Sequence, residues 1–296
     1  MNMNQEELAN AESEFFDFLY SLPESGPVGR VWDNEYTEKI MRGGDSSFVI
    51  GTAVREGGRT LDLGCGTGWL SEMLARNGMN VDGIDISPVA VEKARSRVAR
   101  SLRPNAEMNF WVANLDALRM PAQRYDSVVA WDTLHHIVNL DHLLLEASHT
   151  LKNKGVFCGY EHIGMQRRNR LFILFGLLAV AVLDLAFDHT MLGNEVRSVA
   201  KMIRGALTEE SPREGYIRTL GINVEHEIKA GLGKYFRIQT IRTSDSFSGV
   251  VAPFVGGRKA MRVKTNLCLK WVDNYLIRTG VLRGSHLLFS ATRKTY

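Results

Sequence analysis

The sequence predicts an α/β fold in which helices cover both faces of a mostly parallel sheet. Two apolar runs, residues 60–63 and residues 80–86, predict buried strands, and the segment between them has helical spacing. A glycine-rich turn follows the first run, and Asp85 falls at the end of the second. A strand, a helix and a second strand in this order are typical of a parallel βαβ unit.

The first predicted strand, Thr60–Leu63, continues into a turn with glycine at positions 64, 66 and 68. Glycine tolerates positive φ, and its missing Cβ lets a ligand approach the backbone. The apolar spacing predicts a helix over Trp69–Asn77 that ends at Gly78. Free N–H groups at the start of this helix are expected to face the crevice at the carboxyl end of the strand.

The second predicted strand, Asn80–Ile86, presents Asp85 in its last turn, where a carboxylate can accept two hydrogen bonds from ribose hydroxyls. Two nucleoside ligands fit this pattern, a dinucleotide and S-adenosylmethionine. A dinucleotide fingerprint has its third small residue at position 69, but this chain has Trp69 there and its third glycine at Gly68. The spacing therefore favours S-adenosylmethionine and argues against a nicotinamide oxidoreductase.

From residue 59 to residue 163 the chain resembles the class I S-adenosylmethionine-dependent methyltransferases. The resemblance begins with RTLDLGCGTGWLSEMLARNGMNVDGIDIS (59–87). The next block, FWVANLDALRMP (110–121), resembles the family's third strand and the loop that meets adenine. The block YDSVVAWDTLHHI (125–137) resembles the fourth strand and the turn after it. NLDHLLLEASHTLKNKGVFCGYEHIG (139–164) resembles the next helix, a lysine-rich turn ending in Gly155, and the fifth strand. More loosely, EHIGMQRRNR and ESPREGYIRT resemble a bacterial subgroup linked to glycan, surface and secondary-metabolite pathways.

The resemblance implies a Rossmann-like, seven-stranded, mostly parallel sheet with a helical insertion after strand five. Residues 235–243 and 285–294 are expected as the last two strands, an antiparallel pair at the sheet edge, with a helix over about 262–279 between them. The expected organisation is a helical lid and loop in residues 1–50, a catalytic domain in residues 51–163 and 216–296, and the insertion in residues 164–215.

Two segments outside the catalytic domain have patterns of their own. Residues 7–20 predict an amphipathic helix that closes over the cofactor, and the broken segment 21–36 predicts a loop whose Trp32 and Tyr36 either line the acceptor pocket or pack under the lid. The insertion carries an uncharged run, Leu171–Leu183, which is shorter than the roughly 20 residues of a membrane span. A buried or dimer-facing helix is the simplest interpretation. A cap over a lipophilic acceptor or a contact with a membrane surface is the alternative.

Composition indicates a globular protein, with 45% hydrophobic and 23% charged residues. The three cysteines are isolated and the first residues are acidic, so we expect a reducing cytoplasm and no export. Positive charge is concentrated after residue 150, which indicates either solvated faces or attraction to an anionic acceptor or a membrane surface. Aromatic residues are not interleaved with the basic ones, so nucleic acid is not an expected partner.

The resemblance implies which residues hold the cofactor. Asp62 and the glycine turn are expected at its aminoacyl part, Asp85 at the ribose and Ile86 at adenine. For the adenine amino group, one alignment selects Asn114, which we favour because it directly follows the apolar strand, and another selects Asp116. The expected set is Asp62, Gly64, Cys65, Gly66, Gly68, Asp85, Ile86, Asn114, Leu115, Asp116 and Trp131. No metal is expected, because no cluster has ligand spacing.

A general base would assist methyl transfer to an alcohol. His135, His136, Glu161 and His162 fall at the ends of the fourth and fifth strands, near the place expected for the methyl group. Each also has a structural interpretation, namely an inward-packed histidine or a carboxylate that caps a turn, and Asp132 is a weaker candidate that fits a helix start.

The sequence therefore predicts a methyltransferase acting on a small molecule, preferably on an oxygen of a glycan, a lipid-linked compound or a secondary metabolite. Methylation of nitrogen or carbon is one alternative, and a non-catalytic S-adenosylmethionine-binding regulator or scaffold subunit is another. A homodimer and a peripheral membrane contact are further expectations, both through the apolar insertion.

Overall fold

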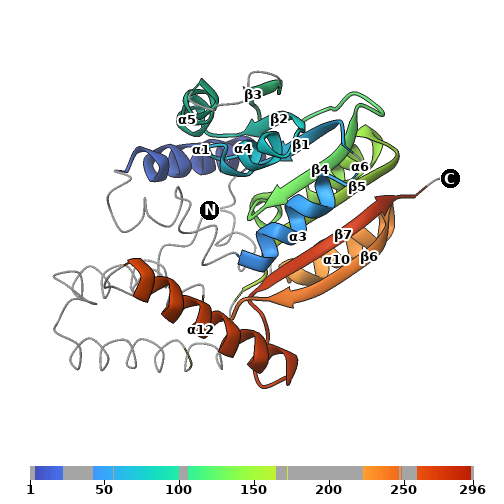
Figure 1. Cartoon of the computed structure of the whole chain (residues 1–296). Helices are drawn as coiled ribbons and strands as arrows, with labels where there is room; N and C mark the ends of the chain where they lie inside the picture. The colour runs from blue at the N-terminus through green and yellow to red at the C-terminus, as the bar shows by residue number, and fades with distance from the viewer. Residues whose placement is uncertain are drawn as a thin grey trace.

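The computed structural model describes residues 4–22, 43–55, 57–99, 106–164, 172, 223–246, 248 and 259–294. Its centre is a seven-stranded sheet in the order β3-β2-β1-β4-β5-β7-β6 (Figure 1). The strands are β1 (Arg59–Leu63), β2 (Asn80–Asp85), β3 (Met108–Val112), β4 (Tyr125–Trp131), β5 (Leu151–His162), β6 (Phe236–Ser244) and β7 (His286–Arg293). Strands β1 to β5 pair in parallel, and β7 is antiparallel to both β5 and β6. The predicted mostly parallel sheet with an antiparallel edge is confirmed.

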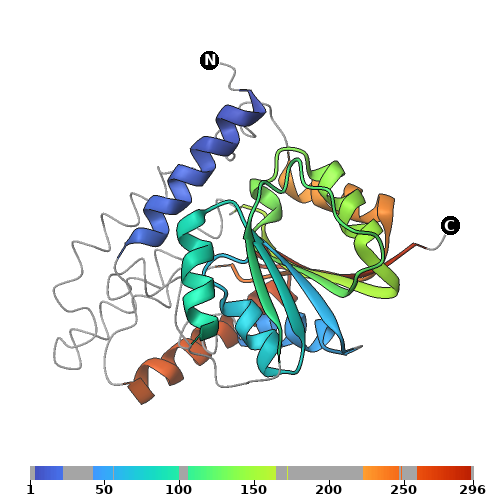
Figure 2. The same ribbon diagram turned by 90° about the horizontal axis from the view of Figure 1, so that it is seen from above.

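Helices cover both faces of this sheet, as predicted (Figures 1 and 2). They are α1 (Gln5–Ser21), α3 (Gly43–Ala53), α4 (Trp69–Arg76), α5 (Pro88–Ala99), α6 (Leu140–Thr150), α10 (Val224–Tyr235) and α12 (Lys259–Arg278), with a short 3-10 helix η2 (Leu134–His136). The expected boundary at residue 50 falls inside α3, which packs against β4, β5 and β7.

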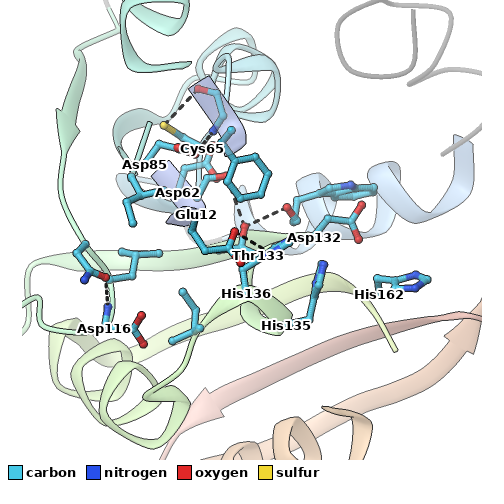
Figure 3. Close-up of a pocket in the computed structure, with 18 of the residues that line it drawn as sticks. Glu12, Asp62, Cys65, Asp85, Asp116, Asp132, Thr133, His135, His136 and His162 are labelled. Carbon is cyan, nitrogen blue, oxygen red and sulfur yellow. Dashed lines mark hydrogen bonds and ion pairs between the residues drawn. The ribbon is translucent and has the colours of Figure 1, made fainter. Parts of the chain in front are cut away.

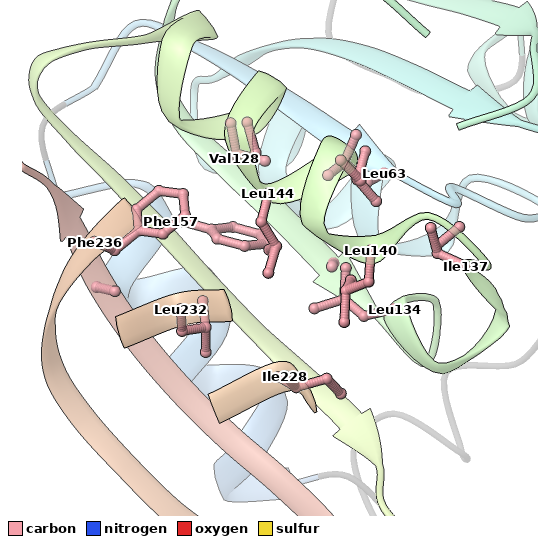
Figure 4. Packing of buried hydrophobic residues seen from close by; sticks show 14 of the residues in the cluster. Leu63, Val128, Leu134, Ile137, Leu140, Leu144, Phe157, Ile228, Leu232 and Phe236 are labelled. Carbon is pink, nitrogen blue, oxygen red and sulfur yellow. The ribbon is translucent and has the colours of Figure 1, made fainter. Parts of the chain in front are cut away.

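The central strands β1, β2 and β4 are buried on both faces, and alternate residues of these strands belong to different cores. In β4, Val128 packs with the side chains of α6 and α10, whereas Val129 packs with those of α3 and α4. Figure 4 shows the first of these cores, in which Leu144, Phe157 and Phe236 meet between α6, α10 and the sheet. Burial on both faces explains why the strands read as nearly continuous apolar runs.

The lysine-rich segment after α6 differs from the expected turn. Strand β5 begins at Leu151, which pairs with Tyr125, but the next pair joins Val156 to Ser127. The strand therefore bulges between these pairs, and Lys152, Asn153 and Lys154 are exposed.

Other expectations fall on parts of the chain outside the described residues. They are the loop from residue 23, with Trp32 and Tyr36, and the insertion after Gly164, except Phe172. No helix in the described part of the chain combines the length and apolar character that crossing a membrane requires.

Candidate active site

A cavity of about 290 Å³ lies where the carboxyl ends of β1, β2 and β4 meet the inner side of α1 (Figure 3). This is the edge of a parallel sheet at which ligands of open α/β folds bind. The sheet order places β1 between β2 and β4, so the point at which the strand order reverses lies beside the glycine turn. Most of the predicted cofactor residues line this cavity, namely Asp62, Gly64, Cys65, Gly66, Asp85, Ile86, Asn114, Leu115, Asp116 and Trp131.

The glycine turn after β1 approaches its neighbours too closely for larger residues. Gly64 has a φ of 66°, and a Cβ there would lie 2.3 Å from Oγ1 of Thr133. Gly66 has a φ of 50°, and a Cβ would lie 2.9 Å from the hydroxyl of Tyr20. Gly68 does not line the cavity. It starts α4 with a φ of 79°, and its missing Cβ makes room for Ala94 of α5.

Two buried carboxylates flank this turn. Asp62 accepts a hydrogen bond from Oγ of Ser71 at 2.6 Å, and burial raises the pKa of Asp62 to about 7. Asp85 accepts from the backbone N–H groups of Gly66 at 2.8 Å and Ser87 at 2.9 Å. Burial raises the pKa of Asp85, and these two hydrogen bonds oppose the rise. Each carboxylate still has lone pairs for a ligand, since an ionised carboxylate offers about four acceptor positions.

The loop after β3 contains both candidates for the adenine contact. Oδ1 of Asn114 accepts from the backbone N–H of Asp116 at 2.9 Å. Oδ1 of Asp116 accepts from the backbone N–H of Asn139 at 2.6 Å, at the start of α6. Both side chains line the cavity, so the geometry leaves both alignments open.

Helix α1 covers one side of the cavity. Leu8, Glu12, Phe16 and Tyr20, spaced four residues apart and therefore on one helical face, all line the cavity. The helix is fixed to the end of β2 by a hydrogen bond from Oγ of Ser13 to the carbonyl oxygen of Ile86 at 3.1 Å. Glu12 and Tyr20 were not selected from the sequence, although their spacing of four and twelve residues from Leu8 places them on the same helical face.

His135 and His136 belong to η2 at the end of β4, and both line the cavity (Figure 3). Nδ1 of His135 lies 3.1 Å from Oε2 of Glu161. Glu161 is fully buried and lies outside the cavity lining, where it also accepts from the backbone N–H of Thr133 at 3.1 Å. Burial, together with the nearby charge of Asp132, raises the pKa of Glu161 to about 8. Glu161 can therefore orient His135 and exchange a proton with it.

The second histidine has partners in α1. Nδ1 of His136 lies 3.6 Å from Oε2 of Glu12, and its ring meets the ring of Phe16 edge-on with centroids 5.0 Å apart. His162, Asp132 and His286 also line the cavity, and His286 was not selected from the sequence. Because β7 is antiparallel to β5, His286 at the start of β7 lies beside His162 at the end of β5. This neighbour relation can be predicted only when the direction of β7 is known.

The residues present fit S-adenosylmethionine. Acceptors for hydroxyl and amino groups are available from Asp62, Asp85, Asn114 and Asp116, and the apolar side chains of Ile86 and Leu115 line the cavity beside them. The hydroxyl of Thr67, in the glycine turn, is buried without a hydrogen-bond partner among the described residues, which leaves it available to a polar ligand. No cluster within the described ranges has the side chains to hold a metal ion.

The sequence profile of a family described as a methyltransferase domain matches residues 60–155, from β1 into β5. The chain belongs to the class I S-adenosylmethionine-dependent methyltransferases. S-adenosylmethionine is the methyl donor of this methyltransferase family.

Two relatives are ubiquinone biosynthesis O-methyltransferases. The protein from Methylocella silvestris is 36% identical over 85 residues, which is 29% of this methyltransferase and 32% of the relative. The protein from Coxiella burnetii is 28% identical over 171 residues, which is 58% of this chain and 68% of the relative. The chain thus matches about a third of the length of the first relative and about two thirds of the second.

The methyltransferase fold also agrees with a solved structure. The N-methyltransferase NodS from Bradyrhizobium japonicum, in complex with S-adenosyl-L-homocysteine, has a TM-score of 0.54 over 96% of this chain and all of its own. The two sequences are 11% identical, so this similarity concerns the fold alone.

Proposed function

We propose that the protein transfers a methyl group from S-adenosylmethionine to an oxygen of a small-molecule acceptor. The observation that carries the proposal is the pair formed by His135 and Glu161, because it presents an imidazole to the cavity that also contains the expected cofactor residues. The names of the relatives, which are O-methyltransferases, support oxygen over nitrogen or carbon.

In this proposal the cofactor lies along the glycine turn. Asp62, Gly64 and Gly66 hold its aminoacyl part, with the hydroxyl of Thr67 as a further contact. Asp85 accepts from the ribose hydroxyls, and Asn114 or Asp116 accepts from the adenine amino group. When bound, S-adenosylmethionine supplies an electrophilic methyl group on a sulfonium.

The protein then has two tasks, which are to orient the acceptor and to remove its proton. Helix α1 and the ring of Trp131 enclose the cavity, and holding two reactants in line can be worth about 7–11 kcal/mol. When Glu161 is ionised, it accepts the Nδ1–H of His135 and leaves Nε2 of this ring to accept the proton of the acceptor. General base catalysis of this kind contributes about 10²–10⁴-fold.

We propose a glycan, a lipid-linked compound or a secondary metabolite as the acceptor. The likeness of EHIGMQRRNR and ESPREGYIRT to a bacterial methyltransferase subgroup supports these classes. The cavity lining supports a compound with hydrogen-bonding groups, because it contains the imidazoles of His135, His136, His162 and His286.

Calorimetry tests the cofactor, and a labelling screen tests the reaction. S-adenosylmethionine and S-adenosylhomocysteine are expected to bind with micromolar-range affinity, and NAD is not. Extracts of the source cell are then incubated with the protein and cofactor labelled in the methyl group, and mass spectrometry identifies the product. His135→Gln is expected to lower turnover about 10²-fold or more, and the exposed His149→Gln serves as a matched control.

The outcomes separate the alternatives. Tight NAD binding without binding of either adenosyl ligand would exclude the methyltransferase proposal. Cofactor binding without transfer to any acceptor would favour the non-catalytic regulator or scaffold. A product methylated on nitrogen or carbon would retain the enzyme and correct the acceptor atom.

A further inference from the structure

A second imidazole and carboxylate lie on the acceptor side of the cavity, apart from His135 and Glu161. Nε2 of His286 is 3.8 Å from Oδ1 of Asp132 and 3.4 Å from Nδ1 of His162. Nδ1 of the same ring is 3.1 Å from Oγ of Ser285. These residues come from the ends of β4, β5 and the start of β7, and Asp132, His162 and His286 all line the cavity.

An aromatic stack supports one face of the His286 ring. It lies on the ring of Tyr160, with centroids 4.5 Å apart and an interplanar angle of 13°, and Tyr160 in turn stacks on Trp131 at 4.4 Å. The hydroxyl of Tyr160 donates to Asp245 at 2.5 Å, and Asp245 forms an ion pair with Lys270 of α12. The stack and this buried chain fix the plane of the imidazole.

The backbone of Asp132 has an unusual conformation. Its φ is 51°, in the left-handed region that residues other than glycine, asparagine and aspartate rarely adopt. The N–H of Asp132 donates to the carbonyl oxygen of Tyr160 at 2.7 Å, which holds this conformation. Residues other than glycine in this region cluster at functional sites. Here this conformation places the carboxylate of Asp132, directly after β4, beside His286 in the cavity wall.

We propose that His286 binds a second polar group of the acceptor, apart from the atom that receives the methyl group, and that Asp132 orients its imidazole. This inference rests on the proposed methyl transfer and deepens it, since it requires an acceptor with at least two hydrogen-bonding groups. His135 then acts on the reacting oxygen, and His286 sets where the acceptor lies. The ring centroids of His135 and His162 are 5.8 Å apart, and those of His162 and His286 are 4.9 Å apart. The three imidazoles therefore form a row along which the acceptor would lie.

This assignment is tested by steady-state kinetics, with the acceptor that the labelling screen identifies. His286→Gln is expected to raise the KM for the acceptor about tenfold or more, the factor that loss of one good hydrogen bond produces, with a smaller effect on kcat. His135→Gln is expected to show the opposite pattern. The affinity for S-adenosylmethionine, measured by calorimetry, should change less than about twofold in His286→Gln, and the exposed His226→Gln is the matched control. An unchanged acceptor KM in His286→Gln would overturn the assignment.

Nuclear magnetic resonance of ¹⁵N-labelled histidine tests the pair without any turnover. Asp132→Asn keeps a residue that tolerates positive φ but removes the charge. The ¹⁵N signals of the ring nitrogens of His286 are expected to change in Asp132→Asn, because the neighbouring carboxylate is lost, and those of His149 to stay. Unchanged His286 signals would overturn the pairing. An absence of methyl transfer by the wild-type protein would instead exclude the proposed function, and the signals of His286 would still decide whether Asp132 controls its ring.

Discussion

Asp85 shapes the glycine turn through hydrogen bonds, and in the proposed function it also binds the ribose of the cofactor. Replacement by alanine removes the acceptor for the ribose hydroxyls and leaves the N–H groups of Gly66 and Ser87 without their partner. Asp85→Ala is therefore expected to weaken S-adenosylmethionine binding by about 1.5–3 kcal/mol, measured by calorimetry. Asp141→Ala, an exposed carboxylate paired with Lys234, is the control. An unchanged dissociation constant would place Asp85 outside the cofactor site.

Glu161 is expected to determine how the rate depends on pH. Its raised pKa, about 8, means that Glu161 ionises only in mildly alkaline solution and then accepts the Nδ1–H of His135. The wild-type rate should rise as the pH passes about 8. Glu161→Gln should lower kcat about 10²-fold and abolish this rise, because an amide does not ionise. Glu107→Gln, at an exposed position, is the control. A mutant that keeps the alkaline rise would assign it to another group.

Most of the expected cofactor residues line one cavity, and the sequence could predict this grouping because the main ones are close to one another along the chain. Asp62, the glycine turn and Asp85 belong to one βαβ unit, and local spacing therefore determines their geometry. Glu12 and His286 come from distant segments, and their place depends on how α1 and β7 pack. Glu161 is buried behind His135 and does not line the cavity. This position depends on where β5 ends relative to β4 in the folded sheet.

Helix α1 is the element whose role can be tested by a matched pair of substitutions. Phe16 lines the cavity and contacts His136, whereas Phe18 of the same helix is 63% exposed. Phe16→Ala is expected to weaken S-adenosylmethionine binding several-fold, because water enters the cavity, and to raise the acceptor KM. Phe18→Ala should change neither quantity. Equal effects of the two substitutions, by calorimetry and initial rates, would mean that α1 does not cover the bound cofactor.

Periodicity predicted the elements with strong patterns and missed those stabilised by packing. The ends of α4, β6 and β7 agree with the sequence to within one or two residues. Sequence analysis did not predict α3, since GGDSSFVIGTA is rich in glycine and β-branched residues that disfavour helices. Its burial against β4, β5 and β7 stabilises the helix instead, with Val49 and Ala53 fully buried.

At the scale of the whole molecule, the number of strands and the antiparallel pair at the sheet edge were expected from family resemblance rather than from residue patterns. Local patterns indicate that β1 and β2 are parallel, but they do not specify which strand lies beside β5. The antiparallel insertion of β7 between β5 and β6 brings His286 to the same edge as His162. This arrangement concentrates buried carboxylates and imidazoles at one end of the sheet.

This concentration should make the folded protein less stable as the pH rises. Burial raises the pKa of Asp62 to about 7 and that of Glu161 to about 8, above the values near 4 of the unfolded chain. Between about pH 4 and pH 8 the folded state therefore binds more protons than the unfolded state, so the contribution of these groups is complete below pH 4 and is lost by about pH 8. Urea denaturation should show a lower free energy of unfolding at pH 8 than at pH 5.

Neutral substitutions at these two sites provide the comparison. The double variant Asp62→Asn and Glu161→Gln should lose less stability than the wild type between pH 5 and pH 8, by about 1 kcal/mol or more. Groups whose pKa is lowered, such as Asp141 beside Lys234, act in the opposite sense only at lower pH and leave this interval unaffected. Equal pH dependence in the two proteins would show that neither buried carboxyl takes up a proton on folding, and the proton exchange assigned to Glu161 and His135 would then lose its basis.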